Sequence, residues 1–200
     1  MEAHETHEQI HEAAHHGHHE EHAHHGVKSS RNRRIAVLIS LLAAMLAIVE
    51  AGGKSAQNAS LSANIRANDL WAFYQAKTIR LTTLKTSADL LELTVPGEAA
   101  AKKVAEWRAN AQRYDSDPEG GDGRKELMAK AKVAEADRDH SLAAYHQFEY
   151  GAAALQIAIV LSSAAVVTGA LALAYFAGGL GLVGIAFGLL GWLAPGLLHL

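Results

Sequence analysis

The chain has 200 residues, of which 20% are charged and 50% are hydrophobic, and it contains no cysteine. These averages resemble those of a soluble domain, but the residue types are segregated. All 39 charged residues (18 basic and 21 acidic) lie in the first 150 positions, and 10 of the 13 histidines lie in the first 25. This distribution excludes one uniform globular domain. The lack of cysteine excludes a disulfide framework, thiol catalysis and cysteine-ligated zinc.

Residues 1–27 form a low-complexity tail, rich in His and Glu, that contains no Lys or Arg. If the tail is helical, seven histidines share about 80° of arc. They are His4, His7, His11, His15, His18, His22 and His25. Imidazoles at this spacing bind Ni, Zn, Cu or Co, so these residues are candidate ligands for a divalent transition metal. The alternative is a solvated, disordered tail without a physiological metal.

Residues 28–53 combine a basic flank with an apolar segment. The flank holds Lys28, Arg31, Arg33 and Arg34, and the next fifteen residues, 35–49, are uncharged. Continued to Gly53, the segment forms about 28 Å of helix, which is enough to cross a bilayer. We expect an uncleaved transmembrane helix. A cleaved signal peptide is the alternative, although its basic region would be unusually long.

Residues 54–150 hold 14 basic and 14 acidic residues and are interrupted at VPG (95–97) and DPEGGDG (117–123). Mostly apolar residues recur every seven positions before the first break and after the second, with polar entries at Lys77, Arg138 and Ser141. The series are Leu70, Lys77, Leu84, Leu91 with Tyr74, Leu81, Ala88, Val95, and Leu127, Ala134, Ser141, Phe148 with Ala131, Arg138, Tyr145, Ala152. This pattern predicts an antiparallel, coiled-coil-like hairpin. The segment 99–114, which presents Trp107 and Tyr114, is predicted to close the seam as a third helix.

Residues 151–177 and 178–200 contain no charged residue and predict a second and a third transmembrane helix. We expect the tight turn between them at Gly178 and Gly179. Small residues recur along the second span at Ala158, Ser162, Ala165, Gly169 and Ala172, and along the third at Gly181, Gly184, Gly188 and Gly191. Such faces allow close helix approach, either within one chain or between copies.

The predicted fold class is therefore all-α: an integral membrane protein with three transmembrane helices and a helical-hairpin soluble block. Basic residues mark the cytoplasmic side of a first span. The cluster at 28–34 predicts a cytoplasmic amino terminus and an extracytoplasmic block at 54–150.

The stretch from Leu61 to Thr83 resembles a bacterial membrane-protein family catalogued as domain of unknown function 4337. Its matching residues are Asp69, Leu70, Trp71, Phe73, Tyr74, Gln75, Lys77 and Arg80. The resemblance implies the same architecture and no activity. With the orientation given by the basic cluster, we expect the chain in the bacterial inner membrane, with residues 54–150 periplasmic or otherwise extracytoplasmic. Aromatic and basic side chains are common interface anchors, so Trp71, Tyr74, Lys77 and Arg80 are candidate contacts to another subunit. The alternative is that Trp107 or Tyr114 covers Trp71 within the chain.

The polar block contains no phosphate-binding loop, zinc-protease motif or nucleophile elbow, and its balanced charge is unlike a nucleic-acid footprint. We expect a non-enzymatic protein of the lipid bilayer that self-assembles or serves as a scaffold or adaptor for a membrane-protein partner, without nucleic acid. One alternative is metal handling or sensing through the His-rich tail, and another is an oligomeric pore.

Overall fold

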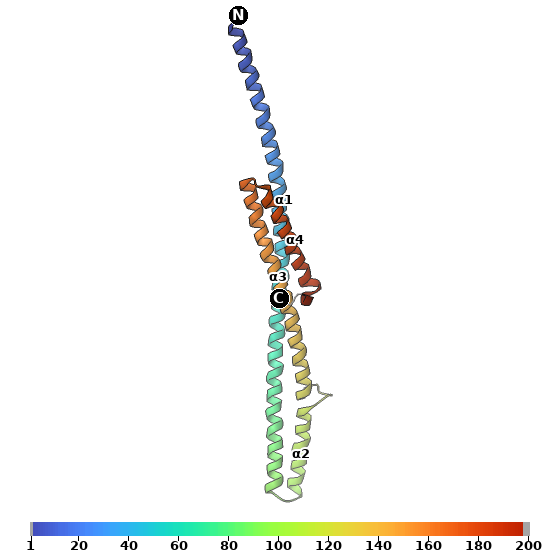
Figure 1. Ribbon diagram of the computed structural model, residues 1–200. Coiled ribbons are helices and arrows are strands. Elements are labelled where there is room, and N and C mark those ends of the chain that lie inside the picture. Colours follow the sequence, from blue (N-terminus) through green and yellow to red (C-terminus); the bar gives the residue numbers. More distant parts are fainter. Residues whose placement is uncertain (1, 198–200) are drawn as a thin grey trace. The chain divides into compact units, whose positions relative to one another are not determined.

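The computed structural model describes the backbone of residues 2–197 and the side chains of residues 32–197. Its elements are α1 (Glu2–Thr94), α2 (Glu98–Asp115), α3 (Arg124–Thr168), α4 (Leu171–Leu193) and the short 3-10 helix η1 (Pro195–Leu197) (Figure 1). Residues 2–197 contain no strand, so the all-α class is confirmed over the described chain. The candidate metal ligands in the tail lie outside the residues whose side chains are described.

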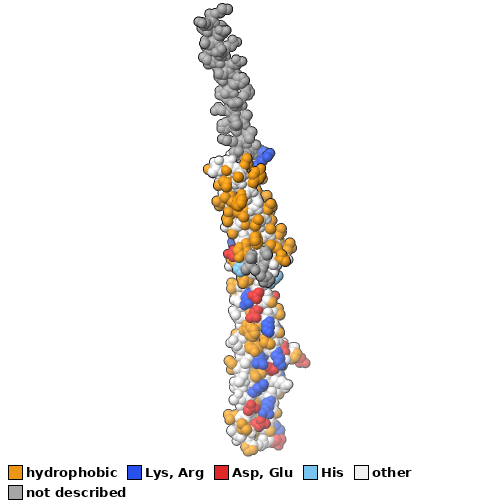
Figure 2. Space-filling model, viewed as in Figure 1, with side chains coloured by type: hydrophobic (Ala, Val, Ile, Leu, Met, Phe, Trp, Pro, Cys, Tyr) orange, Lys and Arg blue, Asp and Glu red, His pale blue; other side chains and the backbone are white. Residues whose placement is uncertain are grey.

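The chain divides into two compact units. The first, here called the apolar unit, comprises residues 1–52 and 147–190, and the second, the polar unit, comprises residues 53–146 and 191–200. Within residues 32–197, three helical stretches are long and apolar enough to cross a membrane: Asn32–Thr94 of α1, Arg124–Thr168 (α3) and Leu171–Leu193 (α4). Figure 2 shows hydrophobic side chains gathered over the described part of the apolar unit, and most of the Lys, Arg, Asp and Glu over the polar unit.

The turn between α3 and α4 lies at Gly169. This residue has φ 72°, a left-handed conformation that glycine adopts without steric cost. Its N–H donates to the carbonyl of Ala165 at 3.0 Å, which caps the end of α3. The prediction of a turn at Gly178 and Gly179 is wrong, since both lie inside α4. A glycine pair is tolerated within a helix. The sequence placed Gly169 and Ala172 on the small-residue face of the second span, whereas Gly169 forms the turn and Ala172 lies in α4.

Helix α4 lies close to α3 and to α1 at positions occupied by glycine. A Cβ on Gly184 would lie 2.7 Å from Cγ of Leu155 and 2.9 Å from the carbonyl oxygen of Gly151. A Cβ on Gly151 would lie 2.8 Å from the carbonyl oxygen of Gly184, and one on Gly188 would lie 2.8 Å from Cγ2 of Val49 in α1. Gly181, Gly184, Gly188 and Gly191 are all buried. These contacts support packing within one chain over packing between copies.

The facing side of α3 is also built from small residues. Ala158, Ser162 and Ala165, which the sequence placed on one face of the second span, are almost completely buried. Leu155 is the large side chain of this face and has no exposed surface. Small side chains let the helices meet at backbone distance, as helix packing in lipid requires.

Within the polar unit, α1 runs antiparallel to α2 and α3, which follow one another along it. Arg108 of α2 donates to Glu92 at 2.6 Å and to Asp89 at 3.1 Å, near the end of α1. Further back along α1, Trp71 contacts Glu135 of α3. The predicted breaks near 95–97 and 117–123 are confirmed.

The loop between α2 and α3 shifts the chain sideways, and α3 continues in the same direction along α1 as α2. The cross-section of the hairpin therefore contains two helices, and the prediction that α2 closes the seam as a third helix is wrong. The buried residues of the polar unit include Ala63, Ala67, Leu81, Ala88, Val104, Ala111, Leu127, Ala131, Ala134 and Ala144. Val95 is 47% exposed instead of continuing the seam, because α1 ends at Thr94.

The close glycine contacts predict opposite effects for two Gly→Ala substitutions in α4. Gly184→Ala should lower the free energy of unfolding by about 1–3 kcal/mol, because its Cβ meets backbone that cannot move aside. Gly179→Ala has no atom within 4 Å of its Cβ and should gain about 0.5–1 kcal/mol from helix propensity. Unfolding of the full chain in mild detergent, followed by circular dichroism, measures both values. Equal stability of the two variants would contradict this packing.

Candidate functional site

The segment of α1 with the signature aromatic residues contacts α3 through Trp71. The indole Nε1 of Trp71 donates to Oε1 of Glu135 at 2.9 Å. The Trp71 and Tyr74 rings meet edge to face, with centroids 5.3 Å apart. A buried indole N–H usually finds a hydrogen-bond partner. This contact pairs Trp71 of α1 with Glu135 of α3 across the seam.

Lys77 occupies a seam position that the seven-residue pattern leaves polar. Its side chain is only 16% exposed, and Nζ donates to Oδ2 of Asp122 at 2.9 Å. Nζ also lies 5.1 Å from the centre of the Tyr114 ring, a cation–π distance. The Lys77 ammonium lowers the pKa of Asp122 below its ordinary value. One lysine of α1 thus contacts both α2 and the loop that follows it.

A second set of charges joins the end of α2 to the start of α3. The carboxylate of Asp115 lies 2.9 Å from Nζ of Lys125 and 2.7 Å from the guanidinium of Arg124. Lys125, followed by Arg124, holds the pKa of Asp115 below its ordinary value despite the opposing effect of burial. Arg124 lies 5.7 Å from the centre of the Tyr74 ring in α1. The junction is therefore tied to the aromatic segment of α1.

The loop itself is held by Glu126. The Ser116 hydroxyl donates to Oε1 of Glu126 at 2.7 Å, and the backbone N–H of Asp117 donates to Oε2 at 3.2 Å. The Ser116 hydroxyl, together with the backbone N–H groups of Glu126 and Asp117, lowers the pKa of Glu126. The loop between α2 and α3 is thus a constrained element of the hairpin.

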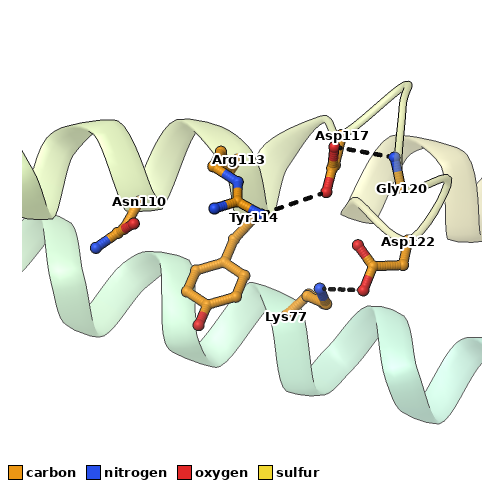
Figure 3. A pocket seen from close by; sticks show the side chains of 7 residues that line it. All are labelled: Lys77, Asn110, Arg113, Tyr114, Asp117, Gly120 and Asp122. Atoms are coloured by element: carbon orange, nitrogen blue, oxygen red, sulfur yellow. Dashed lines mark hydrogen bonds and ion pairs between the residues drawn. The ribbon is translucent and has the colours of Figure 1, made fainter.

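A pocket of about 250 Å³ opens at this junction, between α1, α2 and the loop (Figure 3). Its charged lining residues form two pairs: Lys77 with Asp122, and Arg113 with Asp117 at 3.9 Å. The Gly120 N–H donates to the Asp117 carboxylate at 3.2 Å. Two cations and two carboxylates cancel, so the pocket offers neither a net charge for an ionic ligand nor a free base. Its arrangement fits a structural clamp of the hairpin.

The structure divides the candidate interface residues into two groups. Trp71, Tyr74 and Lys77 face the seam of their own chain, whereas Arg80 is exposed and makes no ion pair with any residue from 32 to 197. Trp71 is half-buried and donates to Glu135 of α3, and among residues 32–197 its ring contacts neither the Trp107 nor the Tyr114 ring of α2. Phe73, another signature residue, is 62% exposed.

No group of three or more potential metal-ligating side chains occurs among residues 32–197. The seven tail histidines lie before this range, so metal binding there stays a prediction.

Sequence reasoning missed the acidic partners Asp115, Asp122 and Glu135. A polar residue at a seam position, such as Lys77, signals that an opposite charge must face it. That signal does not identify the partner, because several acidic residues lie in or near the loop at 116–123. The path of the chain through this loop determines which acidic residue contacts Lys77.

The lowered pKa of Asp115 predicts acid sensitivity. Its ionised form is favoured in the folded chain, so its contribution to stability is complete above about pH 4 and is lost as pH falls through the lowered pKa. Asp115→Asn should cost about 1 kcal/mol at pH 7 and reduce the acid-dependent loss. Glu119→Gln, which changes an exposed loop carboxylate, is the control. Denaturant unfolding of the full chain between pH 7 and pH 3 measures the difference, and identical profiles would contradict the assignment.

Comparison with known proteins agrees with the resemblance in the aromatic segment. The family model described as Domain of unknown function (DUF4337) matches residues 31–194, which include residues 31–94 of α1 and all of α2, α3 and α4. Neither the curated proteins nor the solved structures give a match to the chain. Because the matched range covers most of its length, the chain belongs to the DUF4337 family.

Proposed function

We propose that this protein is a non-enzymatic, membrane-anchored scaffold. Three membrane spans hold a helical hairpin outside the bilayer, where it assembles with copies of itself or with a partner protein. The main support is the continuity of α1 and α3, each of which runs without a break from an apolar segment into the charged hairpin. An unbroken helix satisfies its own backbone hydrogen bonds across both environments and needs no loop at the membrane surface.

The chemistry of the hairpin favours assembly over catalysis. Its least exposed charged side chains, including Lys77 and Asp115, are engaged by opposite charges of the same chain. A general base or nucleophile requires a reactive group that is open to substrate, whereas these groups hold helices together. The exposed surface of the hairpin is therefore the part available for function.

The orientation follows from charge. Arg33 and Arg34 stand at the amino end of the first apolar segment, on the side that the positive-inside rule assigns to the cytoplasm. In the inner membrane of a bacterium, residues 54–150 then lie in the periplasm or otherwise outside the cytoplasm. The bilayer is the first partner of this chain.

Labelling of single introduced cysteines tests the orientation. The chain has no native cysteine that could react with the label. Ala136→Cys, an exposed position of the hairpin, should react with a membrane-impermeant maleimide added to intact spheroplasts. Ser29→Cys, before the first span, should react only after permeabilisation. The reverse pattern would contradict the orientation, and release of the chain by alkaline carbonate would contradict membrane insertion.

Metal handling by the His-rich tail is a second hypothesis, supported by the helical spacing of His4, His7, His11, His15, His18, His22 and His25. Ten histidines in 25 residues give affinity for Ni, Zn, Cu or Co whether or not the cell uses it. Metal binding in vitro therefore does not distinguish this hypothesis from the scaffold, and a cellular measurement is needed.

Deletion of residues 2–26 provides that measurement. For a scaffold, we expect cells that carry the deletion to keep their tolerance to Ni, Zn, Cu and Co and their total metal content. The purified full chain should bind metal in native mass spectrometry, and the truncated chain should not. A change in tolerance or content would favour metal handling over the scaffold alone.

A further inference from the structure

One face of α1 in the polar unit has no partner among residues 32–197. Between residues 61 and 93, the face opposite the seam occupies roughly 100° of arc at 3.6 residues per turn. Its residues, here called the outer face, are Leu61, Ile65, Asn68, Ala72, Gln75, Ala76, Ile79, Thr83, Thr86, Leu90 and Leu93, and every one is exposed. Ile79 is 67% exposed, Leu90 61% and Leu61 58%.

The outer face contains no charged residue, although the surrounding block contains 28, counted as 14 basic and 14 acidic. The other helices of the hairpin differ in this respect. The faces opposite the seam in α2 and α3 include exposed charged residues, such as Glu106 and Lys132, whereas the exposed charged residues of α1, such as Arg80, lie beside the outer face. A solvated helix face normally contains charged side chains, so the outer face has the composition of a contact surface.

The outer face also has the seven-residue repeat of a coiled-coil seam. Ile65, Ala72, Ile79, Thr86 and Leu93 follow one another at intervals of seven. The chain thus has two such stripes on α1, one filled by α2 and α3 and one empty among the described residues. A stripe with this period is suited to another helix running alongside it.

We infer that the outer face of α1 binds the outer face of a second copy of this chain, in a parallel two-fold pair. The inference rests on the proposed function, because membrane insertion gives every copy the same direction and depth. Identical positions then meet across a two-fold axis, Ile79 against Ile79 and Ala72 against Ala72. A charged face would repel its own copy, whereas this uncharged face meets itself without repulsion.

The size of the outer face is consistent with this pairing. About 33 residues span roughly 50 Å of helix, and a strip about 10 Å wide gives roughly 500 Å² per copy. The total of about 1,000 Å² lies at the lower limit for a specific interface. Asn68, Gln75 and the threonines weaken such a contact, but confinement in one bilayer raises the effective concentration of copies.

Disulfide trapping tests the pairing in the full chain, reconstituted into vesicles of phosphatidylethanolamine and phosphatidylglycerol. Ala72→Cys places a thiol on the outer face, and Ala136→Cys places one at an exposed alanine of α3 as the matched control. Because a disulfide requires Cα atoms within about 7 Å, only facing positions are trapped efficiently. We expect at least tenfold more disulfide-linked dimer from Ala72→Cys than from Ala136→Cys.

A charge on the outer face should abolish the trapped dimer. Ile79→Glu in the Ala72→Cys chain brings two like charges together and should reduce the dimer at least tenfold. Val133→Glu, which charges an equally exposed apolar residue of α3 (62%, against 67% for Ile79), should leave it unchanged. Circular dichroism checks that both variants keep their helix content, which exposed positions should allow.

Three outcomes would overturn the inference. The first is an equal yield of disulfide-linked dimer at positions 72 and 136, and the second is a dimer that persists with Ile79→Glu. The third is a disulfide between Ala72→Cys and a different protein in native membranes. Cysteine labelling in spheroplasts separates this failure from failure of the proposed function. An inserted chain with an extracytoplasmic hairpin that yields no dimer through position 72 contradicts the pairing and leaves the scaffold with another partner.

Discussion

The rest of this structure depends on the uninterrupted backbone hydrogen bonding of α1 and α3. Each helix passes from an uncharged segment to one rich in Lys, Arg, Asp and Glu without a break. Gly52 and Gly53 lie inside α1, and Gly151 lies inside α3, where it serves close packing. Peptide groups inside these helices form their hydrogen bonds within the helix. The side chains alone therefore determine whether a segment favours an apolar or an aqueous environment.

The two units achieve packing by different means. In the apolar unit, Gly151, Gly184 and Gly188 let backbones meet, so the contacts are mainly of van der Waals type. In the polar unit, small apolar residues fill a narrow seam, and specific polar contacts such as Trp71 to Glu135 and Lys77 to Asp122 set its register. A seam of alanines alone would allow the helices to slide, whereas each polar contact has one favourable alignment.

A hairpin that is two helices thick leaves half of each helix exposed. In α2 and α3 the exposed side chains include many charged residues, such as Lys102 and Lys132, which solvation by water favours. In α1 the outer face between residues 61 and 93 has no charge, whereas exposed residues beside it, such as Arg80 and Asp89, are charged. This asymmetry is a property of the tertiary arrangement, since a third helix in the seam would have left a different part of α1 exposed. The outer face is therefore exposed because α2 and α3 follow one another along the same side of α1.

The sequence by itself determined the all-helical class, the three apolar segments and the breaks near 95–97 and 117–123. Periodicity, charge and the Pro and Gly of the two loops act locally, so they can be recognised in the chain. Only the tertiary structure decided that α2 extends the line of α3, that the last turn lies at Gly169, and that Glu135 meets Trp71. These outcomes depend on loop direction and on which of several glycines or carboxylates reaches a partner. Long-range packing selects among choices that are locally equivalent.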